Sequence, residues 1–176
     1  MDKIKAIFLD RDGVINLDSG HVGKINDFVF LPRVFESLKM LSSKGYLFII
    51  ITNQSGISRG YYDLEDFFTL NNWMLDKFDE NGIKISGVYF CPHHPDENCN
   101  CRKPKSLMFD SAVSDFNIDE AQSWIIGDKL TDLEIGKNSP CKKILIRSKY
   151  IQNPVDSGIL LVEDLYEAAS FIVNQV

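Results

Sequence analysis

Short apolar runs alternate along this chain with segments in which apolar residues follow a helical spacing. A nearly continuous apolar run is typical of a strand buried on both faces of a parallel sheet. Runs of this kind predict strands at 4–9, 46–52, 88–90, 124–128, 143–146 and 159–162. The first of these strands is interrupted soon afterwards by Gly13, and the second ends in polar residues from Thr52 onward.

Helical spacing fills the intervals between these strands. Helices are predicted at 33–44, 63–81, 106–116, 133–137 and 165–173. Asp63 is a suitable N-cap for the longest helix, and Gly82 follows its end. A regular strand–helix order predicts an α/β fold, a three-layer α/β/α sandwich around a central parallel sheet, in one domain over residues 1–176.

Composition and charge exclude several classes of protein. The chain has 176 residues, a net charge of −6 and 44% hydrophobic residues, which fits one globular domain. An acidic balance argues against nucleic-acid or anionic-membrane partners. The sequence has no apolar run of membrane-spanning length and no signal-peptide pattern, so we expect a cytoplasmic protein, and we expect it to be a monomer.

Acidic and hydroxyl side chains follow three of the predicted strands. Asp10 and Asp12 come after the first, Thr52 ends the second and Asp128 ends the fourth. Ligands of open parallel sheets bind beyond the carboxyl ends of the strands. The fold therefore brings these residues to one crevice, which makes a functional site a better explanation than three unrelated turns.

The Asp10–Asp12 pair favours a metal-assisted reaction. Side chains two positions apart in extended chain point the same way, and like charges held this close suppress each other's ionisation. A divalent cation relieves that conflict, as does a role for one carboxyl as an acid. Asp128 can complete a Mg²⁺ site with Asp10, and Asp132 can orient Asp128 or cap the next helix.

Two further segments suit a phosphate group. Residues 52–60 offer a hydroxyl, amides and free backbone N–H groups, with Gly56 permitting close approach of the backbone to a ligand. Arg102 and Lys103 are adjacent cations that can neutralise a phosphoryl group. Taken singly, the first segment could be a polar turn and the second a solvated surface pair.

Cysteine and histidine residues cluster at about 91–103. Cys91, His93, Cys99 and Cys101 supply three thiolates and an imidazole, a closed tetrahedral set for structural Zn²⁺, with His94 as the alternative imidazole. Pairs this close in sequence are poorly placed for disulfides. Because Arg102 follows Cys101 directly, zinc binding would fix the loop that aims Arg102 and Lys103. Cys141 lies outside this loop and is predicted to be a buried free thiol.

Five motifs together carry a family resemblance. They occupy residues 10–16, 52–60, 91–95, 99–104 and 127–129. In this order and at these strand ends they resemble the haloacid dehalogenase (HAD) superfamily of aspartyl phosphatases, and within it the bacterial heptose bisphosphate phosphatases. The resemblance covers most of the chain and implies a HAD-like Rossmannoid fold. No segment between the motifs is long enough for a separate cap domain.

The resemblance implies a role for each matching residue. Asp10 would be the nucleophile and Asp12 the general acid/base, with Mg²⁺ on Asp10, the main-chain carbonyl of Asp12, and Asp128. Thr52 and Lys103 would steady the transferred phosphoryl group and count with the two aspartates as catalytic. The implied substrate-binding set is Asp18, Ser19, Gly20, His21, Thr52, Asn53, Gln54, Ser55, Arg102, Lys103 and Lys129, to which we add Arg59 as a cation for a second phosphate.

The implied activity is Mg-dependent removal of the 7-phosphate of D-glycero-D-manno-heptose 1,7-bisphosphate, in the supply of ADP-heptose for lipopolysaccharide core. A first alternative is a histidinol-phosphate phosphatase, whose members generally lack the continuation at 55–60. A second is a receiver-like signalling domain, which would not show Mg-dependent multiple turnover of an aryl phosphate. A third is a catalytically silent zinc scaffold, which the intact Asp10, Asp12, Lys103 and Asp128 disfavour.

Overall fold

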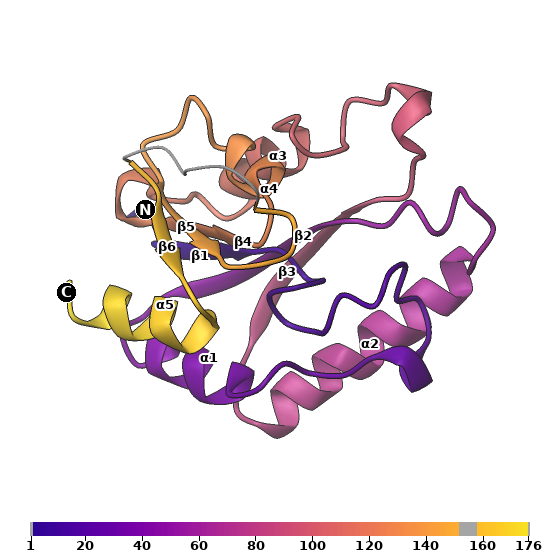
Figure 1. Cartoon of the computed structure of the whole chain (residues 1–176). Helices are drawn as coiled ribbons and strands as arrows, with labels where there is room; N and C mark the ends of the chain where they lie inside the picture. Colours follow the sequence, from indigo (N-terminus) through magenta and orange to yellow (C-terminus); the bar gives the residue numbers. More distant parts are fainter. Residues whose placement is uncertain (1, 152–157, 176) are drawn as a thin grey trace.

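The computed structural model describes residues 2–151 and 158–175 of the chain. Its six strands form one sheet in the order β3-β2-β1-β4-β5-β6, and every neighbouring pair is parallel (Figure 1). The strands are β1 (Ala6–Leu9), β2 (Leu47–Asn53), β3 (Ile85–Cys91), β4 (Trp124–Gly127), β5 (Lys142–Ile146) and β6 (Leu160–Val162). The predicted parallel sheet is confirmed.

Helices cover both faces of this sheet. They are α1 (Val34–Ser42), α2 (Leu64–Glu80), α3 (Leu107–Asp115), α4 (Leu130–Glu134) and α5 (Leu165–Val173), with short 3-10 turns at Ile25–Asp27, Pro95–Glu97 and Glu120–Gln122. In Figure 1, α1, α2 and α5 lie on one side of the sheet, and α3 and α4 lie on the other. The predicted three-layer sandwich is therefore confirmed.

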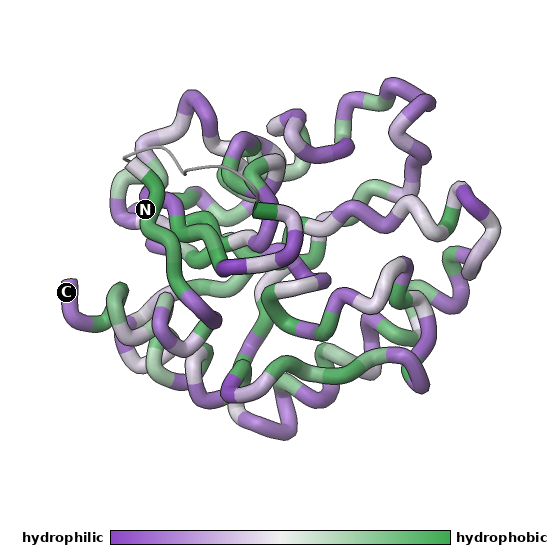
Figure 2. Tube along the Cα trace, in the orientation of Figure 1, coloured by the Kyte–Doolittle hydropathy of each residue, from purple (hydrophilic) through white to green (hydrophobic). Residues whose placement is uncertain are grey.

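Alternating strand side chains supply two separate hydrophobic cores. In β1, Ile7 and Leu9 pack toward α1, α2 and α5, whereas Ala6 and Phe8 pack toward α3 and α4. All four are at most 1% exposed. The central strands are correspondingly apolar along their length (Figure 2). Burial on both faces explains why these strands are readable as continuous apolar runs.

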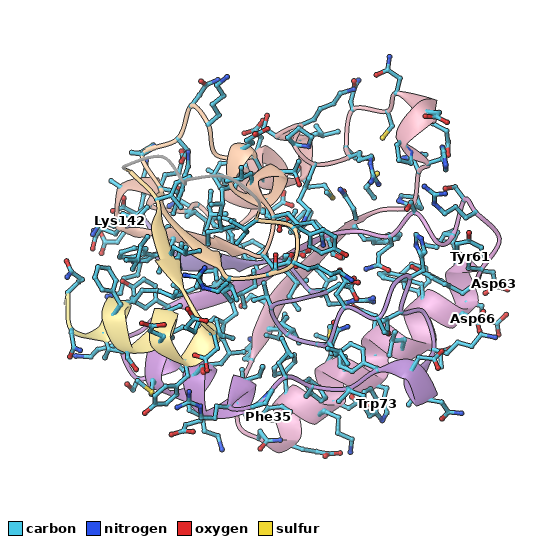
Figure 3. All side chains as sticks on the ribbon, viewed as in Figure 1. Phe35, Tyr61, Asp63, Asp66, Trp73 and Lys142 are labelled. Atoms are coloured by element: carbon cyan, nitrogen blue, oxygen red, sulfur yellow. The ribbon has the colours of Figure 1, made fainter. Side chains whose placement is uncertain are left out.

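Local sequence signals set several element ends. Asp63 is the N-cap of α2, as predicted, and forms a reciprocal capping box with Asp66, which lies beside it in Figure 3. Two predicted ranges were wrong. β3 begins three residues before Val88, and α4 begins at Leu130, not Leu133, because Asp132 caps its first turn through the amides of Asp128 and Lys129.

The strand order reverses between β1 and β4, the two central strands. Crevices at such a switch point, beyond the carboxyl ends of the strands, are where open α/β sheets bind ligands. Asp10 follows β1 and Asp128 follows β4, so both acids project from this position. Among the described residues, none of the helices is long and apolar enough to cross a lipid bilayer.

Candidate active site

Three buried carboxylates meet at the switch point. Side-chain oxygens of Asp10, Asp128 and Asp132 lie within 4.8 Å of one another, and none of the three residues is more than 7% exposed. Hard divalent cations such as Mg²⁺ take oxygen ligands and need few carboxylates when they keep water. The donor set therefore fits Mg²⁺, with Asp10 and Asp128 as the two ligands contributed by strand ends.

Lys103 is the cation at the centre of this acidic cluster. Its Nζ donates to Asp10 Oδ1 at 2.8 Å and to the Ile51 carbonyl at 2.8 Å, and it lies 2.7 Å from Asp132 Oδ1. Burial alone would lower the Lys103 pKa, but the two carboxylates outweigh it and the pKa is raised. Lys103 is therefore held fully charged beside Asp10.

Close backbone packing brings the Asp10–Asp12 turn against Asp128. Gly13 has φ of +91°, and a Cβ built there would meet Asp128 Oδ2 at 2.3 Å. Any side chain at position 13 would collide with that carboxylate and would strain the turn. Gly13 is thus required for the Asp10–Asp12 turn to pack directly against Asp128.

Negative charge exceeds positive charge in the cluster, and this perturbs the acids. Burial and then the neighbouring Asp132 raise the pKa of Asp10 from 3.8 to about 7, although Lys103 opposes the shift. Burial also raises the pKa of Asp128 to about 6, against the opposing effect of Lys129. A raised folded-state pKa means that ionisation destabilises the metal-free fold, and this penalty grows as pH rises from about 4 toward 7.

Magnesium binding should consequently depend on pH. Below about pH 6, Mg²⁺ must displace protons from Asp10 and Asp128, whereas near pH 8 it meets two carboxylates whose repulsion it relieves. At a fixed Mg²⁺ concentration we expect a larger increase in melting temperature near pH 8 than near pH 5.5. Thermal denaturation with and without Mg²⁺ measures this. Equal shifts at both pH values, or an undiminished shift in Asp128→Asn, would contradict the site.

Asp12 is held by four hydrogen bonds on its two carboxylate oxygens. Arg11 Nη2 donates to Oδ1 and Oδ2 at 2.9 and 3.1 Å, Asn16 Nδ2 to Oδ1 at 2.9 Å, and Gln54 Nε2 to Oδ2 at 3.0 Å. The Asp12 side chain is nevertheless 18% exposed. Its carboxyl group is therefore fixed in direction while remaining accessible to a ligand.

Gln54 is itself oriented by Tyr62. The Tyr62 hydroxyl donates to Gln54 Oε1, which leaves Nε2 to donate to Asp12 and to Thr52 Oγ1. The Tyr62 ring occupies the space beside Gly56, where a Cβ would meet it at 2.2 Å. The absence of a side chain at Gly56 thus leaves room for this ring.

A polar cavity of about 420 Å³ opens above these groups. Asp10, Asp12 and Lys103 form part of its lining, and the cations Arg102 and Lys129 also face it. Lys129 Nζ lies 3.3 Å from both Asp128 Oδ1 and Asp18 Oδ2, so it links the β4 end to the 18–23 loop. A cavity lined by both carboxylates and cations suits an anionic ligand bound to a metal.

The predicted cysteine–histidine set converges next to this cavity. The Cys91 and Cys101 sulfurs are 3.1 Å apart, each lies 3.6 Å from the Cys99 sulfur, and His93 Nδ1 is 3.2 Å from Cys101 Sγ. Tetrahedral zinc with Zn–S bonds of about 2.3 Å places its sulfur ligands roughly 3.8 Å apart. The cluster therefore has the composition and nearly the spacing of a closed zinc site.

His94 and Cys141 lie outside that cluster. His94 Nδ1 accepts a hydrogen bond from the Asp96 amide at 3.2 Å at the start of the 95–97 turn. Cys141 is a buried free thiol, as predicted. The loop also supports the neighbouring cations, because Arg102 Nη1 lies 3.5 Å from the His93 carbonyl.

Known proteins match this chain over most of its length. A phosphatase from Haemophilus ducreyi, named D-glycero-beta-D-manno-heptose-1,7-bisphosphate 7-phosphatase, is 47% identical and covers 82% of this chain and 84% of its own. A Campylobacter jejuni relative, named for the alpha substrate, is 46% identical and covers 82% and 83% respectively. The chain belongs to the heptose 1,7-bisphosphate 7-phosphatase family.

Structural comparison agrees with this family membership. A solved heptose bisphosphate phosphatase from B. bronchiseptica, complexed with magnesium and phosphate, superposes with a TM-score of 0.91 at 29% identity. It covers 98% of this chain, and the chain covers all of it. A family model described as HAD-hydrolase-like matches residues 100–168. The predicted HAD-like fold is confirmed, and the protein is a phosphoric monoester hydrolase of that superfamily.

For this family member, most residues of the predicted substrate set meet at one cavity. Those that line it are Asp18, Gly20, His21, Asn53, Gln54, Ser55, Arg102, Lys103 and Lys129. Three predicted residues are not part of its lining. Ser19 is exposed beside it, Arg59 is exposed with its Nε 3.5 Å from Ser55 Oγ, and Thr52 is buried beneath Gln54, which donates to it.

Sequence reasoning missed several residues of this family member's cavity. Tyr62, Thr131 and Tyr150 line it without having been predicted, and Asp132 contacts Lys103 as well as capping α4. The Tyr150 hydroxyl donates to Asp18 Oδ2 at 2.9 Å, across 132 residues of sequence. Tyrosines carry no spacing signal of their own, so only the fold could identify these contacts.

Proposed function

We propose that this protein removes the 7-phosphate of D-glycero-D-manno-heptose 1,7-bisphosphate and leaves the 1-phosphate in place. The observation that carries the proposal is the convergence of Asp10, Asp12, Lys103 and Asp128 in a chain of this family. Relatives are named for both the beta and the alpha sugar, so the proposal extends to the heptose without a choice of anomer. The product would feed ADP-heptose and lipopolysaccharide core synthesis in the cytoplasm, and we propose a monomeric enzyme.

The first step transfers the phosphoryl group to the protein. An Asp10 carboxylate oxygen attacks phosphorus as the bond to the sugar oxygen breaks, and Asp12 delivers its proton to that oxygen. Lys103, which already donates a hydrogen bond to Asp10, offsets negative charge on the phosphoryl oxygens. The four hydrogen bonds on Asp12 keep its carboxyl directed toward the cavity.

The second step releases inorganic phosphate. Asp12, now a carboxylate, takes a proton from a water molecule that attacks the phosphorus of the aspartyl-phosphate. The bond between phosphorus and the Asp10 oxygen breaks, which restores both acids to their starting states. Because one residue donates a proton to the sugar oxygen and then accepts a proton from water, its fixed orientation serves both half-reactions.

Mg²⁺ would be held by Asp10, Asp128 and the main-chain carbonyl of Asp12. It would supply positive charge that neutralises the phosphate oxygens. Thr52 contacts Gln54 in this structure, so we propose that it acts with Gln54 at the edge of the phosphate site. Asn53 exchanges hydrogen bonds with the backbone of Lys103, at 3.0 and 3.3 Å, and would hold that cation beside the substrate.

We also propose that Cys91, His93, Cys99 and Cys101 bind structural zinc. Removing one ligand should lower activity without altering a catalytic group, because Arg102 follows Cys101 and a loosened loop would misplace it. For Cys99→Ser we expect a loss of bound zinc and a fall in kcat/KM of about 10–100-fold. Metal analysis and phosphate release measure the two effects.

Cys141→Ser is the matched control for the zinc prediction. It removes a thiol that lies outside the cluster, and it should retain one equivalent of zinc. Purification without chelator that yields no zinc, combined with full activity in chelator plus excess Mg²⁺, would refute the structural role.

Arg102 should recognise the phosphate that is not cut. It lines the cavity outside the carboxylate cluster, and charge-assisted contacts to phosphate each contribute about 1.5–3 kcal/mol. Arg102→Ala should therefore raise KM for the bisphosphate about 10–100-fold and change KM for a small aryl phosphate far less. Arg147→Ala, which removes an exposed arginine paired with Glu163, is the control. Equal effects on both substrates would assign Arg102 to the chemistry instead.

A phosphate-release screen tests the substrate itself. Both anomers of the heptose bisphosphate, other sugar bisphosphates, sugar monophosphates and histidinol phosphate are compared by kcat/KM. The heptose bisphosphate should give the highest value, and the remaining phosphate should be located at C1. A higher value for histidinol phosphate would overturn the substrate while leaving the two-step mechanism intact.

A further inference from the structure

Arg11 is an unusual residue for the interior of this protein. It stands between the two aspartates of the site in the sequence and is 1% exposed. Among the described residues, it has the largest volume of the fully buried side chains. Arginine remains charged in proteins and is rarely buried without several partners. In the described structure, Nε and Nη1 of Arg11 have no hydrogen-bond partner, so only Nη2 is bonded.

The single bonded nitrogen joins two parts of the site. Arg11 Nη2 donates to both carboxylate oxygens of Asp12 and also to the main-chain carbonyl of Val22. Val22 directly follows the 18–21 segment, whose members Asp18, Gly20 and His21 line the cavity. The guanidinium carbon also lies 5.9 Å from the centre of the buried Phe28 ring.

Stability does not account for this arrangement. A buried ion pair recovers its desolvation cost only when its geometry is excellent and its remaining hydrogen-bonding groups are satisfied. Two of the three guanidinium nitrogens fail that condition among the described residues. An apolar side chain of similar length would fill the same space at lower cost, so the arginine has a purpose other than holding the core together.

We propose that Arg11 is a positioning residue that aligns Asp12 as the proton donor and couples that alignment to the substrate loop at 18–23. Its two contacts with Asp12 orient the carboxyl group. Because the same nitrogen also contacts the Val22 carbonyl, a movement of the loop would change that orientation. Asn16 and Gln54 complete the clamp from the other sides. This inference rests on the role of Asp12 in the proposed function.

The dependence of rate on the leaving group tests this role. Phenyl phosphate releases a more basic oxygen than p-nitrophenyl phosphate and needs protonation more, while the two have nearly the same shape. In Arg11→Lys, which keeps the charge but whose shorter side chain does not carry its nitrogen to the position of Nη2, kcat/KM for phenyl phosphate should fall at least tenfold. For p-nitrophenyl phosphate it should stay within about threefold of the original protein.

Two further variants make the result decisive. Arg33→Lys, at an exposed arginine paired with Asp164, should leave kcat/KM unchanged for both aryl phosphates. Arg11→Met removes the charge and should widen the gap between the two aryl phosphates, and if it fails to fold the lysine variant still decides. Equal losses on both substrates, or no loss in a folded Arg11→Lys, would overturn the proposal.

The heptose bisphosphate forms a separate arm of the same experiment. Failure of the unaltered protein to hydrolyse it would reject the proposed substrate, yet the comparison of the two aryl phosphates would still judge Arg11. Conversely, a fully active bisphosphatase with an Arg11→Lys variant that treats both aryl phosphates alike would reject only the positioning role.

Discussion

Asp10→Asn is expected to abolish phosphate release. An amide is a poor nucleophile toward phosphorus and a poor Mg²⁺ ligand, so both functions proposed for this carboxylate are lost in one change. Removal of a nucleophile in comparable two-step enzymes justifies an expected loss of about 10⁴-fold or more in kcat. Phosphate release under saturating substrate measures the loss, and the Mg²⁺-induced rise in melting temperature should shrink in parallel.

Two other Asp→Asn variants separate this role from general effects. Asp79→Asn changes an exposed residue near the end of α2 and should leave turnover unaltered. Asp12→Asn should still bind Mg²⁺, because the main-chain carbonyl survives, but should stall for lack of an acid. A quenched reaction that traps phosphate on a residue other than Asp10 would contradict the assignment of Asp10 as the nucleophile.

Lys103→Met should combine a large loss of activity with a large loss of stability. The lysine bonds Asp10 and Asp132 in a nearly dry environment, with its side chain only 2% exposed. Removing one partner of a buried ion pair costs about 3–5 kcal/mol of folding free energy, because the remaining charges are uncompensated. Loss of the cation beside the transferred phosphoryl group should lower kcat by about 10²–10³-fold.

The stability loss in Lys103→Met should depend on pH. Near pH 8 Asp10 carries its charge, whereas toward pH 6 it takes up a proton because its pKa is already raised to about 7. Urea unfolding in Mg-free buffer should therefore show a larger penalty at the higher pH. Lys77→Met, at a half-exposed lysine on α2 that pairs with Glu80 outside the site, is the control. A penalty that is small and independent of pH would mean that Lys103 does not compensate these acids.

The architecture could be predicted from sequence because of where its strands lie. Strands buried on both faces must be apolar at almost every position, and this pattern allowed β1, β2, β4 and β5 to be predicted from the sequence. Asp63 marked the start of α2 through side-chain chemistry local to the helix end. The start of α4 was misplaced because Asp132 caps the helix from inside its first turn and not from the position before it.

Sequence motifs also located the chemistry but not its arrangement. The carboxylates at strand ends and the closely spaced cysteines are local patterns, and each falls where the fold brings its members together. The contacts that orient them are not local. Lys103 reaches Asp10 across 93 residues, and Tyr62 holds Gln54 by occupying space left beside Gly56. Such pairings depend on tertiary packing, which produces no periodic pattern in the sequence.

Residue order alone was enough to predict a parallel α/β sheet with acids at its switch point and a cysteine–histidine loop beside them. Hydrophobic burial and ligand chemistry act on residue type, so both are visible in residue order. Three placements follow from tertiary packing: Arg11 is buried against Asp12, Arg59 is not part of the cavity lining, and Tyr150 is part of it. An arginine or tyrosine suits a surface, a core or a site equally well, and its surroundings in space select among them.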